Sequence, residues 1–146
     1  MPDDNIQFHE NSDAVQAHLS ISQSVIQRMS TNSASCKGWC IAIVSAILVV
    51  VADKSKPEYA LIALIPIILF MALDAYYLGL EKRFRASYNN FIEKLHKRGI
   101  TALDLYAIIP TGDPVKIFVK ALLSFSVWPF YIMLLLMVGI TWKYVL

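Results

Sequence analysis

The stretch FMALDAYYLGLEKRFRASYNNF, residues 70–91, decides the fold because it joins two environments along one continuous segment. Its first part, FMALDAYYL, continues an apolar run, whereas GLEKRFRASYNNF is rich in basic and aromatic residues. Gly79 is the only helix breaker between residues 71 and 98, and a single glycine is tolerated within a helix. We therefore expect one helix that leaves an apolar medium and continues into water as a stalk.

The composition places the chain in a membrane. Of its 146 residues, 57% are hydrophobic and only 16% are charged, whereas soluble domains carry about a quarter charged residues. The amino terminus MPDDNIQFHENSD is acidic, unlike a cleavable signal peptide, so insertion is expected through internal segments. A net charge of +2 is too small to indicate nucleic-acid binding.

Three apolar runs predict an all-α membrane protein with three transmembrane helices, at residues 39–52, 59–80 and 121–142. The polar loop DKSKPE, residues 53–58, makes the first two runs a helical hairpin. The first run would reach only about 21 Å, short of the ~30 Å hydrocarbon core, so Lys37 is expected to snorkel to the headgroups.

Two prolines lie inside the longer runs. Pro66 and Pro129 each remove a backbone donor, so we expect a helix kink at both positions. Gly99 is expected to end the stalk, and PTGDP at residues 110–114 to form a turn.

We expect five segments along the chain. A helix covering residues 5–35 dominates the first, and the segment 100–109 is ambiguous. In order, the segments are an amino-terminal cytoplasmic helix (1–35), the first span and its loop (36–56), the second span with its basic stalk (57–98), a cytoplasmic connector (99–120), and the third span with a short outer tail (121–146).

The distribution of basic residues predicts the topology. The segment between the second and third runs holds Lys82, Arg83, Arg85, Lys94, Lys97, Arg98, Lys116 and Lys120, whereas the short loop holds Lys54 and Lys56. The positive-inside rule places the stalk and the amino terminus in the cytoplasm of a bacterium, the carboxyl terminus in the periplasm, and the chain in the inner membrane.

Two cysteines lie one helical turn apart, Cys36 and Cys40. A structural zinc site needs four ligands, and no third cysteine or nearby histidine is present in the sequence. Two small buried residues are the favoured interpretation, and a redox pair is the alternative. A cytoplasmic location would keep both thiols reduced.

Asp74 is the residue that composition and topology do not explain. Asp74 is expected about 9 Å inside the cytoplasmic boundary. An aspartate costs about 2.5–3.5 kcal/mol at a helix centre on insertion scales and less near an interface, and no cation lies three or four residues away. Its partner must come from another helix or subunit, with Lys37 and Lys120 as candidates. A packing role, a pore lining and a proton relay remain open, and Tyr76 and Tyr77 are expected at the headgroup level.

The stalk residues Lys82, Arg83, Arg85, Lys94, Lys97 and Arg98 form a predicted cytoplasmic basic surface. Its positive charge can set the membrane topology and attract anionic lipid headgroups. Alternatively, the surface can bind an acidic partner or a nucleotide. An apolar stripe of Phe84, Tyr88, Phe91 and Leu95 follows helical spacing. We expect further copies of the chain to cover it, since 146 residues offer few internal surfaces.

Two stretches carry a family resemblance. QRMSTNSASCKGW, residues 27–39, and LDAYYLGLEKRFRASYN, residues 73–89, resemble a family of short bacterial multi-pass membrane proteins. Its pattern resembles "LDAYYL-x-x-E-x-x-FR-x-x-Y". The layout is also similar to the SLATT-like membrane effectors of anti-phage defence systems, which have two membrane helices. This resemblance implies an oligomer that breaches the inner membrane when triggered.

The functional expectation is a small oligomeric defence effector that forms or opens a pore. The alternative is a membrane scaffold or accessory subunit that anchors a cytoplasmic partner, and a transporter is a distant third. We expect no enzyme activity, cofactor, metal or nucleic-acid partner. The expected partners are the bilayer, further copies of the chain, and a cytoplasmic protein or signal of the defence system.

Overall fold

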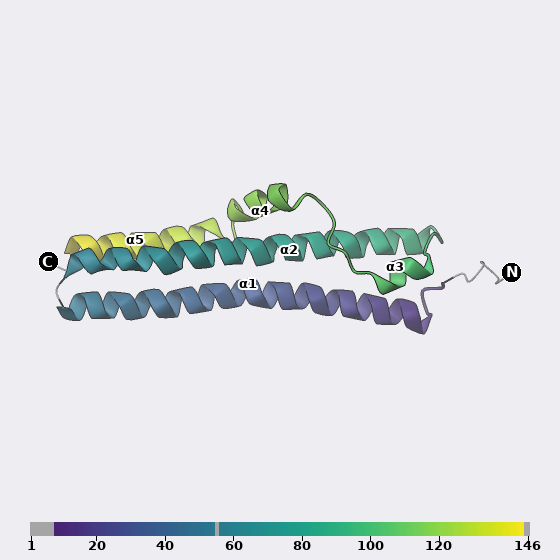
Figure 1. Cartoon of the computed structure of the whole chain (residues 1–146), viewed down its shortest axis with the longest axis horizontal. Coiled ribbons are helices and arrows are strands. Elements are labelled where there is room, and N and C mark those ends of the chain that lie inside the picture. Colours follow the sequence, from purple (N-terminus) through teal and green to yellow (C-terminus); the bar gives the residue numbers. More distant parts are fainter. Residues whose placement is uncertain (1–7, 55, 145–146) are drawn as a thin grey trace.

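The computed structural model describes residues 8–54 and 56–144, and all of its regular elements are helices (Figure 1). In chain order they are α1 (Asp13–Lys54), the 3-10 helix η1 (Pro57–Ala63), α2 (Leu64–His96), α3 (Ala102–Tyr106), α4 (Pro114–Leu122) and α5 (Trp128–Tyr144). The all-α prediction is confirmed. Residues 5–7 of the expected amino-terminal helix, part of the 53–58 loop and the last tail residues lie outside the described ranges.

A long antiparallel hairpin of α1 and α2 is the body of the molecule (Figure 1). On α1 the buried residues recur every three or four positions up to Val44 and then at Val51, two turns on, which is the spacing of one helix face. They are Val15, His18, Ser22, Ile26, Met29, Ser33, Cys36, Cys40, Val44 and Val51. This face extends from Val15 to Val51, so both the polar first part and the apolar second part of α1 pack against α2.

This continuity corrects two sequence expectations. The separate helix at 5–35 and the span at 39–52 are a single helix, because Gly38 is the one helix breaker in residues 36–38 and the buried face keeps its phase across it. The helix also begins at Asp13, since residues 8–12 are not helical. Ser12 precedes the helix and its carbonyl accepts from the Gln16 amide at 3.0 Å.

Two helical segments are long and apolar enough to cross a membrane: α1, and η1 together with α2 over Pro57–His96. We call residues 38–54, 57–80 and 127–144 the apolar half, and residues 13–37 and 81–96 the polar arm. The apolar half has its own core, formed by Cys40, Val44, Val51, Ala60, Ala63, Ile67, Val127, Tyr131, Leu134 and Val138. Its outer face is also apolar, with Ile65 69% exposed and Val49 68% exposed.

Neither proline kinks a helix interior, which corrects both kink predictions. Pro66 is the third residue of α2, directly after η1, and Pro129 is the second residue of α5. First-turn amides have no partner within their helix, so the missing proline donor is harmless there. The prolines mark where these helices start.

The third apolar run is therefore not one helix. α4 ends at Leu122 and α5 begins at Trp128, and a turn separates them. The Ser124 carbonyl closes this turn by accepting from the amides of Val127 at 2.9 Å and Trp128 at 3.2 Å. α5 consequently has 17 residues, fewer than the run of residues 121–142 suggested.

The predicted stalk is confirmed as a continuation of α2, which runs without interruption to His96. It ends two residues before the expected Arg98. Arg98 takes the left-handed conformation with φ of 55°, and the Gly99 amide then donates to the Lys94 carbonyl at 2.9 Å. Gly99 closes the cap, whereas Arg98 makes the turn.

The apolar stripe of the stalk is covered within the chain at its far end, whereas Phe84 and Tyr88 are only half-buried. This corrects part of the reason given for self-association. Phe91 and Leu95 are each 6% exposed and form a small core with Val15. Tyr88 accepts a hydrogen bond from the Gln23 amide group at 3.2 Å. Because α1 continues along the stalk, it covers Phe91 and Leu95, which we expected a second copy to cover.

The ambiguous segment after the stalk contains α3, which is held by a capping box. The Thr101 amide donates to Asp104 at 3.0 Å, and the Thr101 hydroxyl lies 2.9 Å from the same carboxylate. Lys94 of α2 reaches the other carboxylate oxygen at 2.7 Å. His18 of α1 lies 3.0 Å from the Leu105 carbonyl oxygen, so α3 is fixed to both long helices.

Acid is expected to release α3. Hydrogen bonds from Lys94 and Thr101 hold the pKa of Asp104 at about 2, below its ordinary 3.8. Because this pKa is lowered by folding, the stabilisation is complete above about pH 4 and is lost as the pH falls through about 2. Hydrogen exchange of the α3 amides should accelerate over that range.

The matched control for the acid experiment is Asp104→Asn, which should abolish the pH dependence. Lys97 also lowers the pKa of Glu93, so the readout must be local to α3 rather than global. Unchanged α3 exchange down to pH 2 in the parent protein would contradict the prediction.

Candidate functional site at the junction of the hairpin

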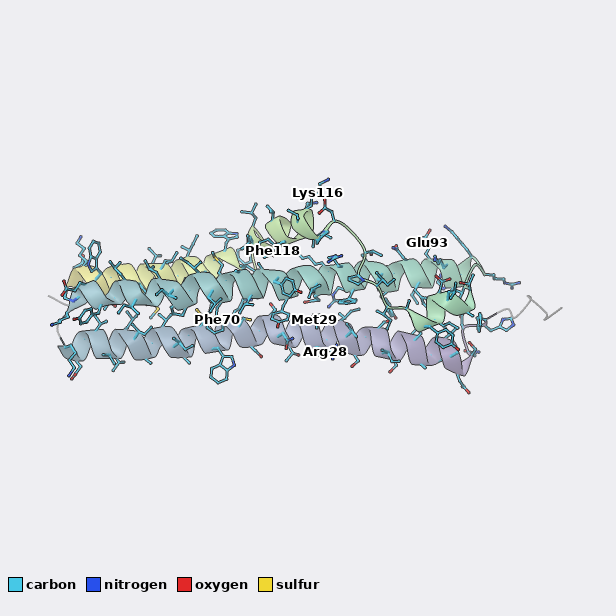
Figure 2. All side chains as sticks on the ribbon, in the orientation of Figure 1. Arg28, Met29, Phe70, Glu93, Lys116 and Phe118 are labelled. Atoms are coloured by element: carbon cyan, nitrogen blue, oxygen red, sulfur yellow. The ribbon has the colours of Figure 1, made fainter. Side chains whose placement is uncertain are left out.

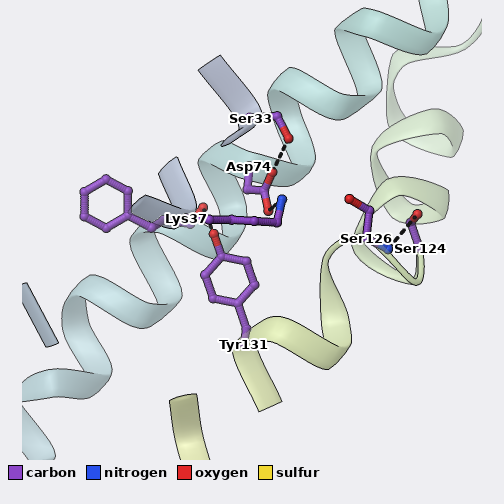
Figure 3. Close-up of polar contacts among 7 residues, drawn as sticks. Ser33, Lys37, Asp74, Ser124, Ser126 and Tyr131 are labelled. Carbon is purple, nitrogen blue, oxygen red and sulfur yellow. Dashed lines mark hydrogen bonds and ion pairs between the residues drawn. The ribbon is translucent and has the colours of Figure 1, made fainter. Parts of the chain in front are cut away.

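The most distinctive polar site is a buried cluster where the apolar half meets the polar arm (Figure 3). Asp74 of α2 is completely buried, with 0% of its surface exposed. The Ser33 hydroxyl donates to one carboxylate oxygen, and the Lys37 Nζ lies 2.5 Å from the other. Lys37 thus compensates the charge of Asp74, and Ser33 of the same helix adds a hydrogen bond.

The local sequence explains why both partners reach the same carboxylate. Ser33 and Lys37 are four residues apart, so they lie one above the other on α1. The Lys37 side chain is 21% exposed, which fits a long apolar stem that crosses the seam with its charged end inside. Of the candidate cations, Lys37 is confirmed, and the pair forms within one chain.

α5 joins the hairpin at the same level. The Tyr131 hydroxyl donates to the Phe70 carbonyl at 3.0 Å, one turn before Asp74 on α2 (Figure 3). Tyr131 is 1% exposed and belongs to the core of the apolar half. Its hydroxyl satisfies the polar requirement of a buried tyrosine, and the contact fixes the register of α5 on α2.

Sequence reasoning missed Ser33 and Tyr131 as members of this cluster. A signal for Ser33 existed, because it continues the spacing of Ser22, Ile26 and Met29 along the buried face. No such sequence signal existed for Tyr131, because a uniformly apolar run does not show which of its faces will contact α2.

The two tyrosines after Asp74 are not a single group. Tyr76 is 51% exposed and lines a crevice of about 40 Å³ beneath α4, together with Gly79 and Arg83. Tyr77 is half-buried, and its ring meets the Tyr76 ring edge-on at 5.6 Å. The polar contacts of Asp74 described above come from α1, not from these tyrosines.

Half of the residues in the predicted basic surface are paired with neighbouring carboxylates. Three of its six residues form ion pairs: Arg85 with Glu81 at 2.8 Å, Lys94 with Asp104 at 2.7 Å, and Lys97 with Glu93 at 2.5 Å. Arg83 donates to the Pro110 carbonyl at 3.2 Å. Lys82 is exposed and Arg98 makes the turn after α2. This pairing leaves less free positive charge for binding an acidic partner.

The chemistry that the cluster shows is charge pairing between Lys37 and Asp74. Within residues 8–54 and 56–144, no group of three or more His, Cys, Asp or Glu side chains could hold a metal ion. Cys36 and Cys40 are buried free thiols on the same face of α1. A buried ion pair contributes little net stability, yet breaking it is costly. The cluster can therefore hold α1 against α2, and we call this Ser33–Lys37–Asp74 contact the latch.

Comparison with protein families, curated proteins and solved structures finds no match to this chain. The resemblance to short bacterial membrane proteins and SLATT-like effectors thus remains a proposal. The site must be interpreted from its own geometry.

Proposed function

We propose that this protein is a small inner-membrane effector of a bacterial defence system, in which a cytoplasmic arm is coupled to membrane-spanning helices. The observation that carries the proposal is the continuity of α1 and α2, which join the polar arm to the apolar half without a loop. A signal received by the arm can act directly on the Ser33–Lys37–Asp74 cluster at the junction.

The proposed topology places the arm in the cytoplasm and the carboxyl terminus in the periplasm. Basic residues concentrated between Leu80 and Lys120 favour this orientation. The apolar half of the hairpin supplies two spans. α5 would be the third, because its 17 residues extend about 26 Å, near the lower limit for crossing a bilayer.

The effector proposal includes a closed and an open state. Asp74 has no exposed surface, so it cannot line a pore in the arrangement described here. The lipid-facing surface is apolar, with residues such as Val49, Ile65 and Met133 exposed. A pore would require several copies and separation of α1 from α2 at the cluster, which would turn Lys37 and Asp74 towards water.

A second candidate function is a membrane anchor that presents the arm to a cytoplasmic partner without permeabilising the membrane. The closed Lys37–Asp74 pair and the apolar outer face of the spans favour it. In this case the cluster only fixes packing, and the open state never forms.

Membrane potential distinguishes the two candidates. In cells that express the protein, Lys37→Met should weaken the latch and depolarise the inner membrane relative to the wild type. Lys97→Met is the matched control, because Lys97 pairs with Glu93 on the exposed side of the same hairpin. A potential-sensitive dye provides the readout, and the amount of each variant in the membrane fraction must be equal.

Subunit number provides an independent measurement. The effector proposal predicts an oligomer by native mass measurement in detergent, at least for the Lys37→Met variant. A monomer that leaves the membrane potential intact in every variant would reject the effector and leave the anchor.

A further inference from the structure

α4 is an amphipathic helix whose inner side packs tightly on α2. A Cβ atom at Gly79 would make ordinary van der Waals contact with α4, at 3.7 Å from the Ile117 side chain and 3.8 Å from the Phe118 backbone, so α4 lies against α2 at this point. In Figure 2, Phe118 points towards α2, whereas Lys116 points away from the hairpin. The inner side is therefore occupied, and the outer side is open.

The outer side of α4 is apolar, and a row of lysines borders it. Val115 is 68% exposed and Val119 is 47% exposed, and Leu123 continues their four-residue spacing at 73%. Lys116 and Lys120 follow the same spacing on the adjacent face and are exposed. An apolar stripe beside lysines is typical of helices that lie at a membrane surface.

The position of α4 fits such a surface. α4 lies beside α2, just beyond the end of α5, where the apolar half gives way to the polar arm (Figure 1). The exposed Phe125 extends the apolar stripe into the turn before α5. Arg83 lies beneath α4, and its buried Nε has no acceptor among the described residues.

We propose that α4 docks on the cytoplasmic leaflet, with Val115, Val119 and Leu123 in the acyl boundary and Lys116 and Lys120 on anionic phospholipid headgroups. The charge of the lysines selects anionic lipid, since basic residues near a membrane surface are attracted to it. This inference rests on the topology of the proposed function, but it concerns lipid recognition and not membrane permeability.

The test reads the environment of a label at residue 119. A fluorophore on Val119→Cys, in a Cys36→Ala/Cys40→Ala background, reports from the full chain in vesicles. The vesicles contain phosphatidylcholine alone or with added phosphatidylglycerol. Acrylamide quenches from water, and a shallow spin-labelled lipid quenches from the membrane. Ser24→Cys on the exposed side of the arm is the aqueous control, and Leu136→Cys on α5 is the insertion control.

The expected result is several-fold protection of residue 119 from acrylamide, relative to residue 24, in phosphatidylglycerol vesicles. Lys116→Gln/Lys120→Gln should reduce this protection there and change little in phosphatidylcholine alone. Equal acrylamide access at residues 119 and 24 would overturn the proposal. Protection that ignores lipid charge, or that disappears as the protein is diluted in lipid, would also overturn it, the latter by identifying a second copy as the occupant.

The controls separate this inference from the proposed function. Water access at residue 136 would show that α5 is not inserted, which rejects the three-span topology itself. A protected residue 136 with an exposed residue 119 rejects only the lipid-binding role of α4.

Discussion

Replacing Lys37 with methionine is expected to destabilise the protein by about 3–5 kcal/mol, the usual effect of leaving one member of a buried ion pair without its partner. Asp74 is 0% exposed, and its side chain cannot reach water from the seam between α1 and α2. The carboxylate must then remain charged in an apolar environment or take up a proton, and both are unfavourable.

Replacing Asp74 instead of Lys37 should destabilise the protein less, and this asymmetry makes the prediction specific. In Asp74→Leu the unpaired charge belongs to Lys37, whose side chain is 21% exposed. A lysine at that position can snorkel to the headgroups and recover hydration. The loss from Asp74→Leu should therefore be clearly smaller than the loss from Lys37→Met.

The double variant Lys37→Met/Asp74→Leu completes the cycle. Replacing both members of a buried pair by apolar residues is often neutral or stabilising, so the double variant should recover most of the stability. Denaturant titration in bicelles measures all four free energies of unfolding. Lys97→Met is the control and should change them by less than about 1 kcal/mol. A Lys37→Met value equal to that control would show that the buried pair does not form.

Phe91→Ala is expected to cost about 3–5 kcal/mol, as other buried phenylalanine truncations do, and to open the arm alone. The Phe91 ring stacks on His18 with centroids 4.1 Å apart and packs with Val15 and Leu95. This core is separate from the core of the apolar half. Loss of the ring should therefore separate α1 from α2 in the arm and leave the apolar half paired.

Hydrogen exchange measures this local effect. In Phe91→Ala, amides of residues 13–30 and 84–96 should exchange faster, whereas those of the apolar half should not change. Ile21→Ala is the matched control, because Ile21 lies on the same helix but is 54% exposed. If the arm is covered by other copies rather than by α1, exchange should instead depend on protein concentration.

The apolar runs and the unbroken segment from Met71 to Arg98 were enough to predict helices and the stalk. Hydrophobic periodicity and the absence of breakers are local properties, so they can be read directly from residues. The same local rules failed at the prolines. Pro66 and Pro129 lie near helix starts, and the competing outcomes of a kink or a new helix depend on the turns that precede them.

At the Asp74 site, too, the sequence predicted one part and the tertiary structure decided the other. The sequence determined that Asp74 needs a cation from another helix, because burying a carboxylate in an apolar run is unfavourable and its own helix offers none. Only the tertiary structure decided that Lys37 provides it, with Ser33 beside it and Tyr131 fixing α5 nearby. The register of α1 on α2 depends on packing along the entire hairpin, and that same packing buries Phe91 and Leu95 of the stalk stripe, for which we expected a second copy.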